Sequence, residues 1–423
     1  MLENKQNDKA ILVGSYLSSQ DKKECFENLQ ELKSLAQTFG LQTIHSMACH
    51  LRQISAATYI GKGKVEELLV LAQKENISTF IFDDELSPHQ QRNLEKMLKH
   101  SVIDRTELIL GVFAKRARTK EAKTQVKLAQ YKYEMPRLKR LWTHLSRQKI
   151  GGGSGGYLKG EGERQIEIDK RLIKNKIAYL QSKLDEVKKH RETQRRQRQR
   201  HFFPTFAIVG YTNVGKSTLL NTLTNSKVLV EDKLFATLDT TTRKFVMDNH
   251  QEVLLVDTVG FIRKLPHTLV ASFRSTLEEL GFADILLHLV DVSHPNAEKQ
   301  AESALQVIKE LDLGNRPIIT VLNKTDLVTD HRKIFKFKIT YPFTVEMSVL
   351  KKIGVQKLLE LMAKQIAALR TTIKLKIPQS QYELASLLMQ KGRVISKEYQ
   401  DNDILFEAEI PAALESKFLD FKV

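Results

Sequence analysis

Four short segments in the second half of the chain place glycine, lysine, hydroxyl and carboxylate groups directly after apolar runs. The first is GYTNVGKS at residues 210–217, which fits the pattern G-x-x-x-x-G-K-[ST]. It follows the apolar run 206–209 and precedes a leucine-containing stretch at 219–223 that is typical of a helix. A strand that leads through a glycine loop into a helix predicts a phosphate-binding loop.

The polar residues of this loop have separate roles in that prediction. Gly210 and Gly215 let backbone N–H groups turn toward phosphate oxygens. Lys216 would reach the β- and γ-phosphates of a nucleoside triphosphate, and Ser217 would offer its hydroxyl to Mg²⁺. Asn213, in the middle of the loop, could help hold a K⁺ ion that acts as a fixed positive charge. A loop-stabilising role for Asn213 is an equally open alternative.

The segment DTVG at residues 257–260 follows a second buried-looking strand, 253–256. This position puts the Asp257 carboxylate at the carboxyl end of a strand, where an outer ligand of Mg²⁺ belongs. Gly260 could then approach the γ-phosphate through its N–H. An ordinary Asp-Thr turn would explain the segment alone, but its spacing of 40 residues from Ser217 favours the nucleotide interpretation.

The segment NKTD at residues 323–326 indicates which base is bound. It follows the apolar run 318–322, which predicts another buried strand. The Asp326 carboxylate can accept hydrogen bonds from N1–H and from the exocyclic amino group of guanine, whereas adenine offers no matching donors. Ser348 begins a loop that could lie behind the guanine ring. Together the segments predict a GTP-hydrolysing site.

The threonine-rich segment 235–243 (FATLDTTTR) predicts a loop that responds to the nucleotide. We assign Thr237 as its Mg²⁺ ligand, with Thr240 or Thr241 as alternatives. Phe261 stands directly after DTVG, where many small GTPases carry a glutamine that orients the attacking water. A phenyl ring cannot do this, so we expect slow intrinsic hydrolysis that a partner accelerates.

Composition and charge constrain the rest of the chain. Its 423 residues suffice for about three domains, and 41% hydrophobic residues can form real cores. No apolar run is long enough to span a membrane, no signal-peptide core is present, and only two cysteines occur, so we expect a cytoplasmic protein without disulfides. Residues 115–200 hold 26 Lys and Arg against nine Asp and Glu, an excess equal to the whole net charge of +17. That concentration predicts binding to an RNA backbone.

The basic segment has a helical pattern. Apolar residues recur at alternating spacings of four and three along 173–187, at Ile173, Ile177, Leu180, Leu184 and Val187. A glycine-rich stretch at 151–162 (GGGSGGYLKGEG) is unsuited to a helix. We therefore predict two antiparallel helices joined by a flexible tip loop. A second, shorter apolar stripe upstream consists of Leu138, Leu141 and Leu145. Trp142 could stack on a base, although packing near this leucine stripe is the favoured role.

The pattern predicts an α/β chain with four parts. Residues 1–115 form an α/β domain, with apolar runs at 11–13, 80–82 and 108–113 and an amphipathic helix at 25–39. Residues 116–200 form the basic antiparallel hairpin with its tip at 151–162. Residues 201–370 form a P-loop GTPase domain with a mostly parallel sheet and helices on both faces, and residues 371–423 form a small α+β appendage.

At this level the chain resembles the HflX family of ribosome-associated GTPases. The resemblance rests on YIGKGK at 59–64, DDELSP at 83–88, the tip and the following residues to 173, FATLD at 235–239 and DTVGFI at 257–262. It implies a ribosome-associated GTPase that binds the large ribosomal subunit and its RNA and helps to dissociate stalled or stressed ribosomes. We also expect the protein to be a monomer. Carried onto this sequence, it implies Lys216, Thr237 and Gly260 in catalysis and Ser217 and Thr237 at Mg²⁺. The residues implied to line the nucleotide are Gly210, Tyr211, Thr212, Asn213, Val214, Gly215, Lys216, Ser217, Phe235, Ala236, Thr237, Leu238, Asp239, Asp257, Thr258, Val259, Gly260, Asn323, Lys324, Thr325, Asp326, Ser348, Val349 and Leu350.

Two other functions fit the same residues. A GTPase of large-subunit biogenesis would carry the same motifs and would bind immature particles best. An RNA-binding or RNA-remodelling protein could use its nucleotide site only to regulate affinity. The completeness of the GTPase segments favours an enzyme over this last alternative, but the sequence does not separate ribosome splitting from subunit assembly.

Overall fold

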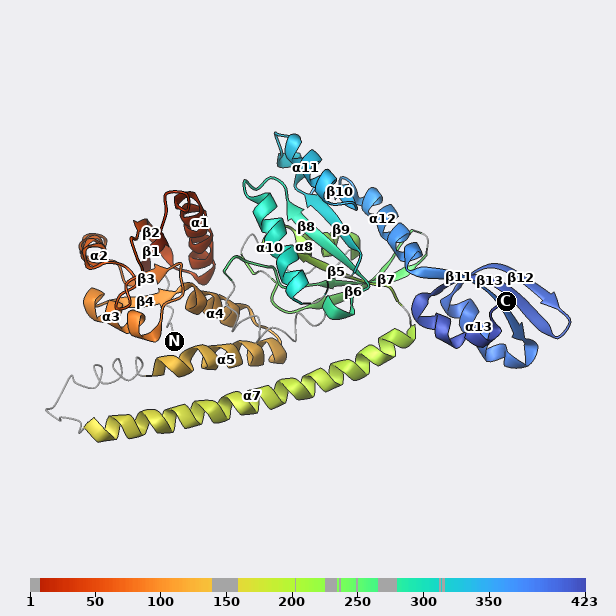
Figure 1. The fold of residues 1–423 in the computed structure, drawn as a ribbon, viewed down its shortest axis with the longest axis horizontal. Helices are drawn as coiled ribbons and strands as arrows, with labels where there is room; N and C mark the ends of the chain where they lie inside the picture. Colours follow the sequence, from red (N-terminus) through yellow and green to blue (C-terminus); the bar gives the residue numbers. More distant parts are fainter. Residues whose placement is uncertain are drawn as a thin grey trace. The chain divides into compact units, whose positions relative to one another are not determined.

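The computed structural model describes residues 8–138, 159–201, 203–224, 234–235, 237–248, 250–264, 280–311, 313 and 316–423 (Figure 1). Contacts divide the chain into two compact units. The first comprises Met1–Lys188, Leu229–Asp239 and Val259–Leu277. The second comprises Lys189–Val228, Thr240–Thr258 and Glu278–Val423. The first unit therefore includes two segments on either side of residues 240–258, namely Leu229–Asp239 and Val259–Leu277.

The N-terminal part of the first unit is a four-stranded parallel sheet in the order β2-β1-β3-β4. Helices α2 and α3 cover one face and α1 and α4 the other (Figure 1). The apolar runs 11–13 and 80–82 lie in buried strands, and the run 108–113 lies in a helix. The elements are β1 (Lys9–Tyr16), α1 (Lys22–Phe39), β2 (Gln42–His50), α2 (Lys62–Glu75), β3 (Thr79–Phe82), α3 (Pro88–Leu98), β4 (Ser101–Asp104) and α4 (Arg105–Arg116).

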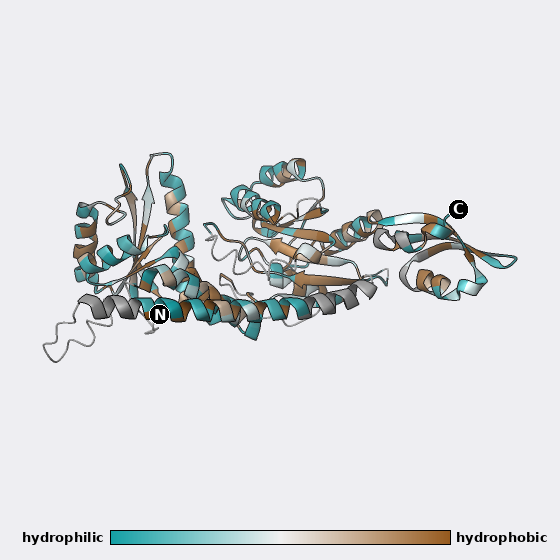
Figure 2. Cartoon of the chain, turned by 60° about the horizontal axis from the view of Figure 1, so that its bottom comes forward, coloured by the Kyte–Doolittle hydropathy of each residue, from teal (hydrophilic) through white to brown (hydrophobic). Residues whose placement is uncertain are grey.

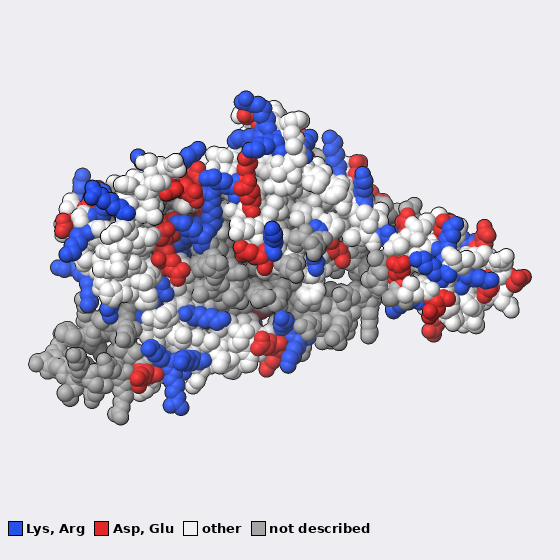
Figure 3. All heavy atoms as spheres, viewed as in Figure 1, with Lys and Arg blue, Asp and Glu red and all other residues white. Residues whose placement is uncertain are grey.

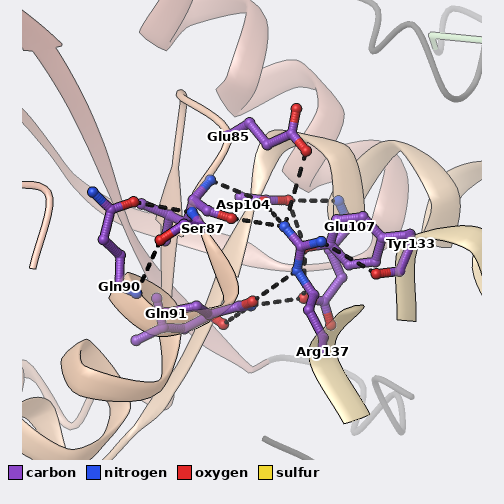
Figure 4. Close-up of polar contacts among 10 residues, drawn as sticks. Glu85, Ser87, Gln90, Gln91, Asp104, Glu107, Tyr133 and Arg137 are labelled. Atoms are coloured by element: carbon purple, nitrogen blue, oxygen red, sulfur yellow. Dashed lines mark hydrogen bonds and ion pairs between the residues drawn. The ribbon is translucent and has the colours of Figure 1, made fainter. Parts of the chain in front are cut away.

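A buried polar cluster joins this sheet to the end of helix α5 (Figure 4). Arg137, just after α5 (Lys120–Glu134), donates to the carbonyl oxygen of Leu86 at 2.7 Å and to the side chain of Gln91 at 3.2 Å. Tyr133 donates to Asp104 at 2.9 Å. Burial raises the pKa of Asp104 to about 6, and the backbone N–H of Glu107 opposes that shift. Because these polar groups satisfy one another away from water, the end of α5 is fixed to the sheet.

The predicted hairpin is represented by two described helices, α5 and the long α7 (Lys159–His201). Within the first unit they run antiparallel, and the Lys176 ammonium lies 5.5 Å from the centre of the Tyr131 ring (Figure 1). The five residues of the predicted apolar stripe are the buried or half-buried positions between residues 171 and 188. Trp142 and tip residues 151–158 lie outside the described residues. For residues 159–162 the prediction of a loop is wrong, because α7 already begins at Lys159 despite Gly160 and Gly162.

We call the antiparallel pair of helices α5 and α7 the arm. The exposed side of its helix α7 is basic. In the described side chains of 167–189, α7 carries seven Lys or Arg and four Asp or Glu. Figure 3 shows these blue side chains along α7, and Figure 2 shows that the helix is mostly hydrophilic. Much of the predicted charge excess falls on side chains beyond this described stretch. The described part agrees in sign with the predicted RNA-binding surface.

The second unit contains a six-stranded sheet in the order β10-β9-β8-β5-β7-β6, parallel except for the pair β6 and β7. Helices lie on both of its faces, and in Figure 2 its strands are apolar. This confirms the predicted α/β class. The elements are β5 (Thr205–Gly210), α8 (Lys216–Thr224), β6 (Thr241–Val246), β7 (Glu252–Asp257), β8 (Ile285–Asp291), α10 (Ala297–Glu310), β9 (Ile318–Asn323), α11 (Arg332–Thr340), β10 (Thr344–Glu346) and α12 (Val355–Ala368).

The C-terminal appendage is a three-stranded antiparallel sheet in the order β11-β13-β12 with one helix. Its core contains Leu375, Phe406 and Phe418. It is an α+β structure, as predicted. The elements are β11 (Arg370–Pro378), α13 (Tyr382–Lys391), β12 (Arg393–Gln400) and β13 (Asp403–Pro411), and short 3-10 turns occur at Met135–Arg137, Leu280–Phe282, Thr325–Leu327, Gln379–Gln381, Ala412–Lys417 and Leu419–Phe421.

None of the helices in the described ranges is both long and apolar enough to cross a membrane. Over those same ranges, no group of three or more His, Cys, Asp and Glu side chains is placed to hold a metal ion.

The core of the second unit contains one titratable residue that it keeps neutral. His288 lies in β8 between β5 and β9, is 1% exposed, and both its ring nitrogens are without a partner among the described residues. Burial lowers the pKa of His288 to about 4. In the unfolded chain the His288 ring binds a proton near pH 6.5, whereas in the folded state it does so only near pH 4. The free energy of unfolding therefore falls as the pH drops from about 6.5 toward 4.

We predict that His288→Leu removes much of this acid sensitivity. At pH 5 the wild-type protein should have lost about 2 kcal/mol of stability that the variant keeps. Urea unfolding of both proteins at pH 7 and pH 5, followed by circular dichroism, measures the difference. An equal loss in the two proteins would show that His288 is not the group responsible.

Candidate nucleotide-binding site

The phosphate-binding loop leaves β5 at a point of close backbone contact. Gly210 has φ +152°, and a Cβ there would lie 2.4 Å from the carbonyl oxygen of Leu289 in β8. Gly215 has φ +100°, and its Cβ would lie 2.5 Å from the side-chain nitrogen of Asn323. Both positions require glycine, for conformation and for space. The loop then passes directly into α8 at Lys216.

Lys216 lies with its ammonium inside the loop. It is 7% exposed and donates to the carbonyl oxygens of Tyr211 at 2.7 Å and Gly210 at 3.3 Å. Burial lowers the pKa of Lys216 to about 8, although Asp257 opposes the shift. A cation held mainly by neutral carbonyl groups is suited to an anionic ligand. In the same loop, the buried hydroxyl of Thr212 has no partner among the described residues.

Two further residues of the predicted site meet beside the loop. The Ser217 hydroxyl donates to the Asp257 carboxylate at 2.7 Å, and Asp257 is fully buried at the end of β7. Thr258 donates to the carbonyl oxygen of Ile208 at 2.7 Å, which fixes the DTVG segment to β5. A hydroxyl and a carboxylate in contact are hard oxygen donors that fit Mg²⁺, which usually takes one or two protein ligands together with phosphate oxygens.

Asn323 connects the phosphate loop with the predicted guanine loop. Its side-chain nitrogen donates to the carbonyl oxygen of Val214 at 2.7 Å, and its side-chain oxygen accepts from the backbone N–H of Val349 at 3.0 Å. Lys324 donates to the carbonyl oxygen of Asn213 at 3.1 Å and pairs with Asp291 at 2.6 Å. These contacts place the first and last predicted segments in one site.

Asp326 is positioned by the loop that follows β10. A hydrogen bond from Ser348, and a second from Lys351, lower the pKa of Asp326. The Lys351 ammonium lies 3.2 Å from its carboxylate. Thr325 is fixed by donation to the carbonyl oxygen of Met347 at 3.0 Å. Asp326 is therefore held as a carboxylate, the form that accepts hydrogen bonds from guanine. Val349 is buried in this loop, and Leu350 is 84% exposed.

The remaining predicted residues belong to the first unit, where their contacts are with the N-terminal part. Phe235 packs edge-to-face on Phe113 of α4, with ring centres 4.6 Å apart. Asp239 accepts from the hydroxyl of Thr119 at 2.5 Å and from the backbone N–H groups of Arg118 and Thr119, at the start of α5. Leu238 and Phe261 are buried, Thr237 and Val259 are half-buried, Gly260 is buried, and Ala236 lies outside the described residues. Their nucleotide-binding roles stay predictions.

Sequence reasoning missed two charged partners in the second unit. Asp291, which pairs with Lys324, ends β8 at the same sheet edge as Asp257 and Asn323. The apolar run before it was a usable signal, because the carboxyl ends of parallel strands meet at one edge. Lys351, which pairs with Asp326, had no such signal because it lies in a short irregular loop.

Family models match most of the chain in three consecutive parts. The model described as "GTP-binding GTPase N-terminal" matches residues 26–114, "GTP-binding GTPase Middle Region" matches 116–198, and "50S ribosome-binding GTPase" matches 205–324. With the phosphate loop, the Ser217–Asp257 pair and the NKTD loop assembled on a parallel sheet, the fold and the matches define a P-loop GTPase.

Relatives cover nearly the whole length. The GTPase HflX of Chlamydia pneumoniae is 47% identical over 99% of this chain and 90% of its own. The GTPase HflX of Caldanaerobacter subterraneus is 41% identical, with 99% and 94% covered. The protein of that name from Escherichia coli is 39% identical, with 94% and 91% covered. This chain therefore belongs to the HflX family of GTPases, as its motifs indicated.

We predict that Asp326→Asn changes base selectivity. The amide cannot accept from both guanine donors, so affinity for GDP should fall by about one to two orders of magnitude, while xanthosine diphosphate, with an oxygen in place of the amino group, should gain affinity. Competition against a fluorescent GDP analogue measures both affinities. Asp330→Asn is the matched control, because Asp330 is an exposed carboxylate paired with Arg332. Unchanged selectivity would remove Asp326 from the base site.

Proposed function

We propose that this GTPase binds the large ribosomal subunit and uses GTP to dissociate stalled or stressed ribosomes in the cytoplasm, acting as a monomer. The description of the family model that matches residues 205–324, "50S ribosome-binding GTPase", supports the partner. The basic antiparallel pair of helices α5 and α7 supports a contact with ribosomal RNA, because phosphate groups attract such a surface. The domain limits at 115, 200 and 370 remain part of this proposal.

The proposal gives each site residue a task. Lys216 neutralises charge on the β- and γ-phosphates, and the phosphate loop holds the nucleotide through backbone N–H groups. Ser217 and Thr237 would hold Mg²⁺, which would supply positive charge to the phosphates. Gly260 contacts the γ-phosphate through its N–H. Asn323, Lys324 and Asp326 hold the guanine, and the loop containing Ser348, Val349 and Leu350 lies behind it.

No residue of this chain is assigned to orient the attacking water. Phe261 is 4% exposed and carries no hydrogen-bonding group. The group that completes the reaction would then come from the ribosome or from an ordered switch segment. We expect hydrolysis to depend on the large subunit because Phe261 has no hydrogen-bonding group.

We predict that purified large ribosomal subunits raise the rate of GTP hydrolysis by at least tenfold at one fixed salt concentration. ATP should not be hydrolysed faster, and higher salt should weaken the effect because phosphate contacts are screened. Phosphate release measured with and without subunits tests the first point, and sedimentation of intact ribosomes tests dissociation. A rate that large subunits leave unchanged would contradict the proposed partner.

We also propose that Asn213 helps to hold a K⁺ ion beside the phosphates. Its backbone has φ +62°, and its carbonyl oxygen accepts from Lys324. If K⁺ supplies positive charge during the reaction, replacing KCl by NaCl at equal ionic strength should slow hydrolysis several-fold while GDP affinity stays the same. Equal rates in the two salts would leave Asn213 with the loop-stabilising role alone.

A further inference from the structure

The N-terminal sheet has a polar site of its own at its carboxyl edge. Its strand order places β1 between β2 and β3, so the connections from β1 and β3 leave in opposite directions. In open α/β sheets, ligands bind at such a point, beyond the carboxyl ends of the two strands. Here Ser15 near the end of β1 and the residues Asp83 and Asp84, directly after β3, converge on it.

The side chain of Lys264, from the segment that follows DTVG, lies at this carboxyl edge of the N-terminal sheet. The Lys264 ammonium lies 2.5 Å from one oxygen of Asp83 and 2.6 Å from one oxygen of Asp84. Next to it, Arg263 pairs with Glu27 of α1 at 3.3 Å. All of these residues belong to the first unit.

The carboxylate pair, Asp83 and Asp84, is built so that each member also has a permanent partner. The second oxygen of Asp83 accepts from Arg105 at 2.6 Å, and Arg105 also pairs with Glu31 at 2.8 Å. The second oxygen of Asp84 accepts from the hydroxyl of Ser15 at 2.7 Å. If Lys264 leaves, each carboxylate keeps one hydrogen-bond donor, but the donor to Asp84 is a neutral hydroxyl and Arg105 is shared with Glu31. Separation therefore leaves negative charge without a cationic partner, and this cost favours the state in which Lys264 is bound.

The ion pairs are partly shielded from water. Asp83 is 3% exposed and the Lys264 side chain is 39% exposed. Burial alone would lower the pKa of Lys264, but Asp83 and Asp84 raise it above its usual value. Burial would raise the pKa of Asp84, but Lys264 lowers it. Lys264 is therefore held as a cation between two carboxylates.

We propose that the carboxylate pair is a receptor site for Lys264, through which the N-terminal domain holds the DTVG-linked segment and opposes its movement toward the γ-phosphate. Lys264 is four residues after Gly260, too few for the two to move independently. The segment Val259–Leu277 belongs to the first unit, together with the carboxylate pair. In this proposal, Lys264 bound to the carboxylate pair and Gly260 bound to the γ-phosphate are competing states, and a ligand that favours one of them is coupled to the other.

This coupling discriminates between nucleotides. A triphosphate offers the γ-phosphate that draws Gly260, and a diphosphate does not. Removing the Lys264 contact should therefore raise affinity for a non-hydrolysable GTP analogue by about fivefold to tenfold and leave GDP affinity unchanged. The inference concerns relative affinity, so it stands or falls separately from the proposed action on ribosomes.

The test compares Lys264→Met with the wild-type full-length protein, because methionine removes the charge and keeps much of the side-chain length. Affinities for GDP and for the GTP analogue are measured by titration calorimetry. Lys336→Met is the matched control, since Lys336 is an exposed lysine of α11 that pairs with Glu298 at 2.6 Å and is not a residue of either site. Unchanged GDP affinity shows that the nucleotide site of each variant is intact.

A second variant tests the receptor side. Asp84→Asn keeps the shape of the residue and its contact with Ser15, and should also raise the affinity ratio. In a double-mutant cycle, Asp84→Asn should add little further change to Lys264→Met, because both act through one contact. An unchanged or lowered ratio of GTP-analogue to GDP affinity in Lys264→Met, or full additivity in the cycle, would overturn the proposal.

Discussion

The nucleotide site depends on one buried amide, the side chain of Asn323. It donates to the phosphate loop at Val214 and accepts from the predicted guanine loop at Val349, so it fixes the distance between these two loops. Gly215 must be glycine because this amide occupies the space of its Cβ. Loss of the amide would leave two buried backbone groups without partners, at about 1–3 kcal/mol each. Lys324 reinforces the same connection through Asn213.

The parallel strands of both sheets share one arrangement of apolar and polar residues. The strands supply apolar residues to the core and end in polar residues at the carboxyl edge, as Asp257, Asp291 and Asn323 do in the second unit. In the N-terminal sheet the corresponding edge carries Asp83 and Asp104. One of these carboxylates anchors the arm helix through Tyr133, and the other holds Lys264. The N-terminal domain thus contacts both the arm and a segment linked to the nucleotide site.

Sequence patterns predicted the parts of the site that are local. The glycine loop, DTVG and NKTD each follow an apolar strand, and parallel strands necessarily bring their carboxyl ends together, so the meeting of Ser217 with Asp257 could be predicted. The contact of Lys264 with Asp83 joins residues 181 positions apart, and no periodicity or motif indicates such a pairing. The same holds for Asp239 and Thr119, which are 120 positions apart. The segment DDELSP contributes to the family resemblance, but its chemical role depends on Lys264, a partner that only the fold brings to it.

The backbone at Lys264 adds a reason why its contact is suited to release. Lys264 has φ +51°, a left-handed conformation that costs a residue with a side chain roughly 1–3 kcal/mol. The two ion pairs offset this strain while the lysine is bound, and in the proposed movement a change of backbone conformation would relieve it. Arg105 and Ser15 would each keep a hydrogen bond to one carboxylate, but Asp84 would then face only a neutral hydroxyl, so part of the roughly 3–5 kcal/mol cost of breaking a buried pair remains. That remaining cost, less the relieved strain, is what contacts with the γ-phosphate have to offset in the proposed coupling.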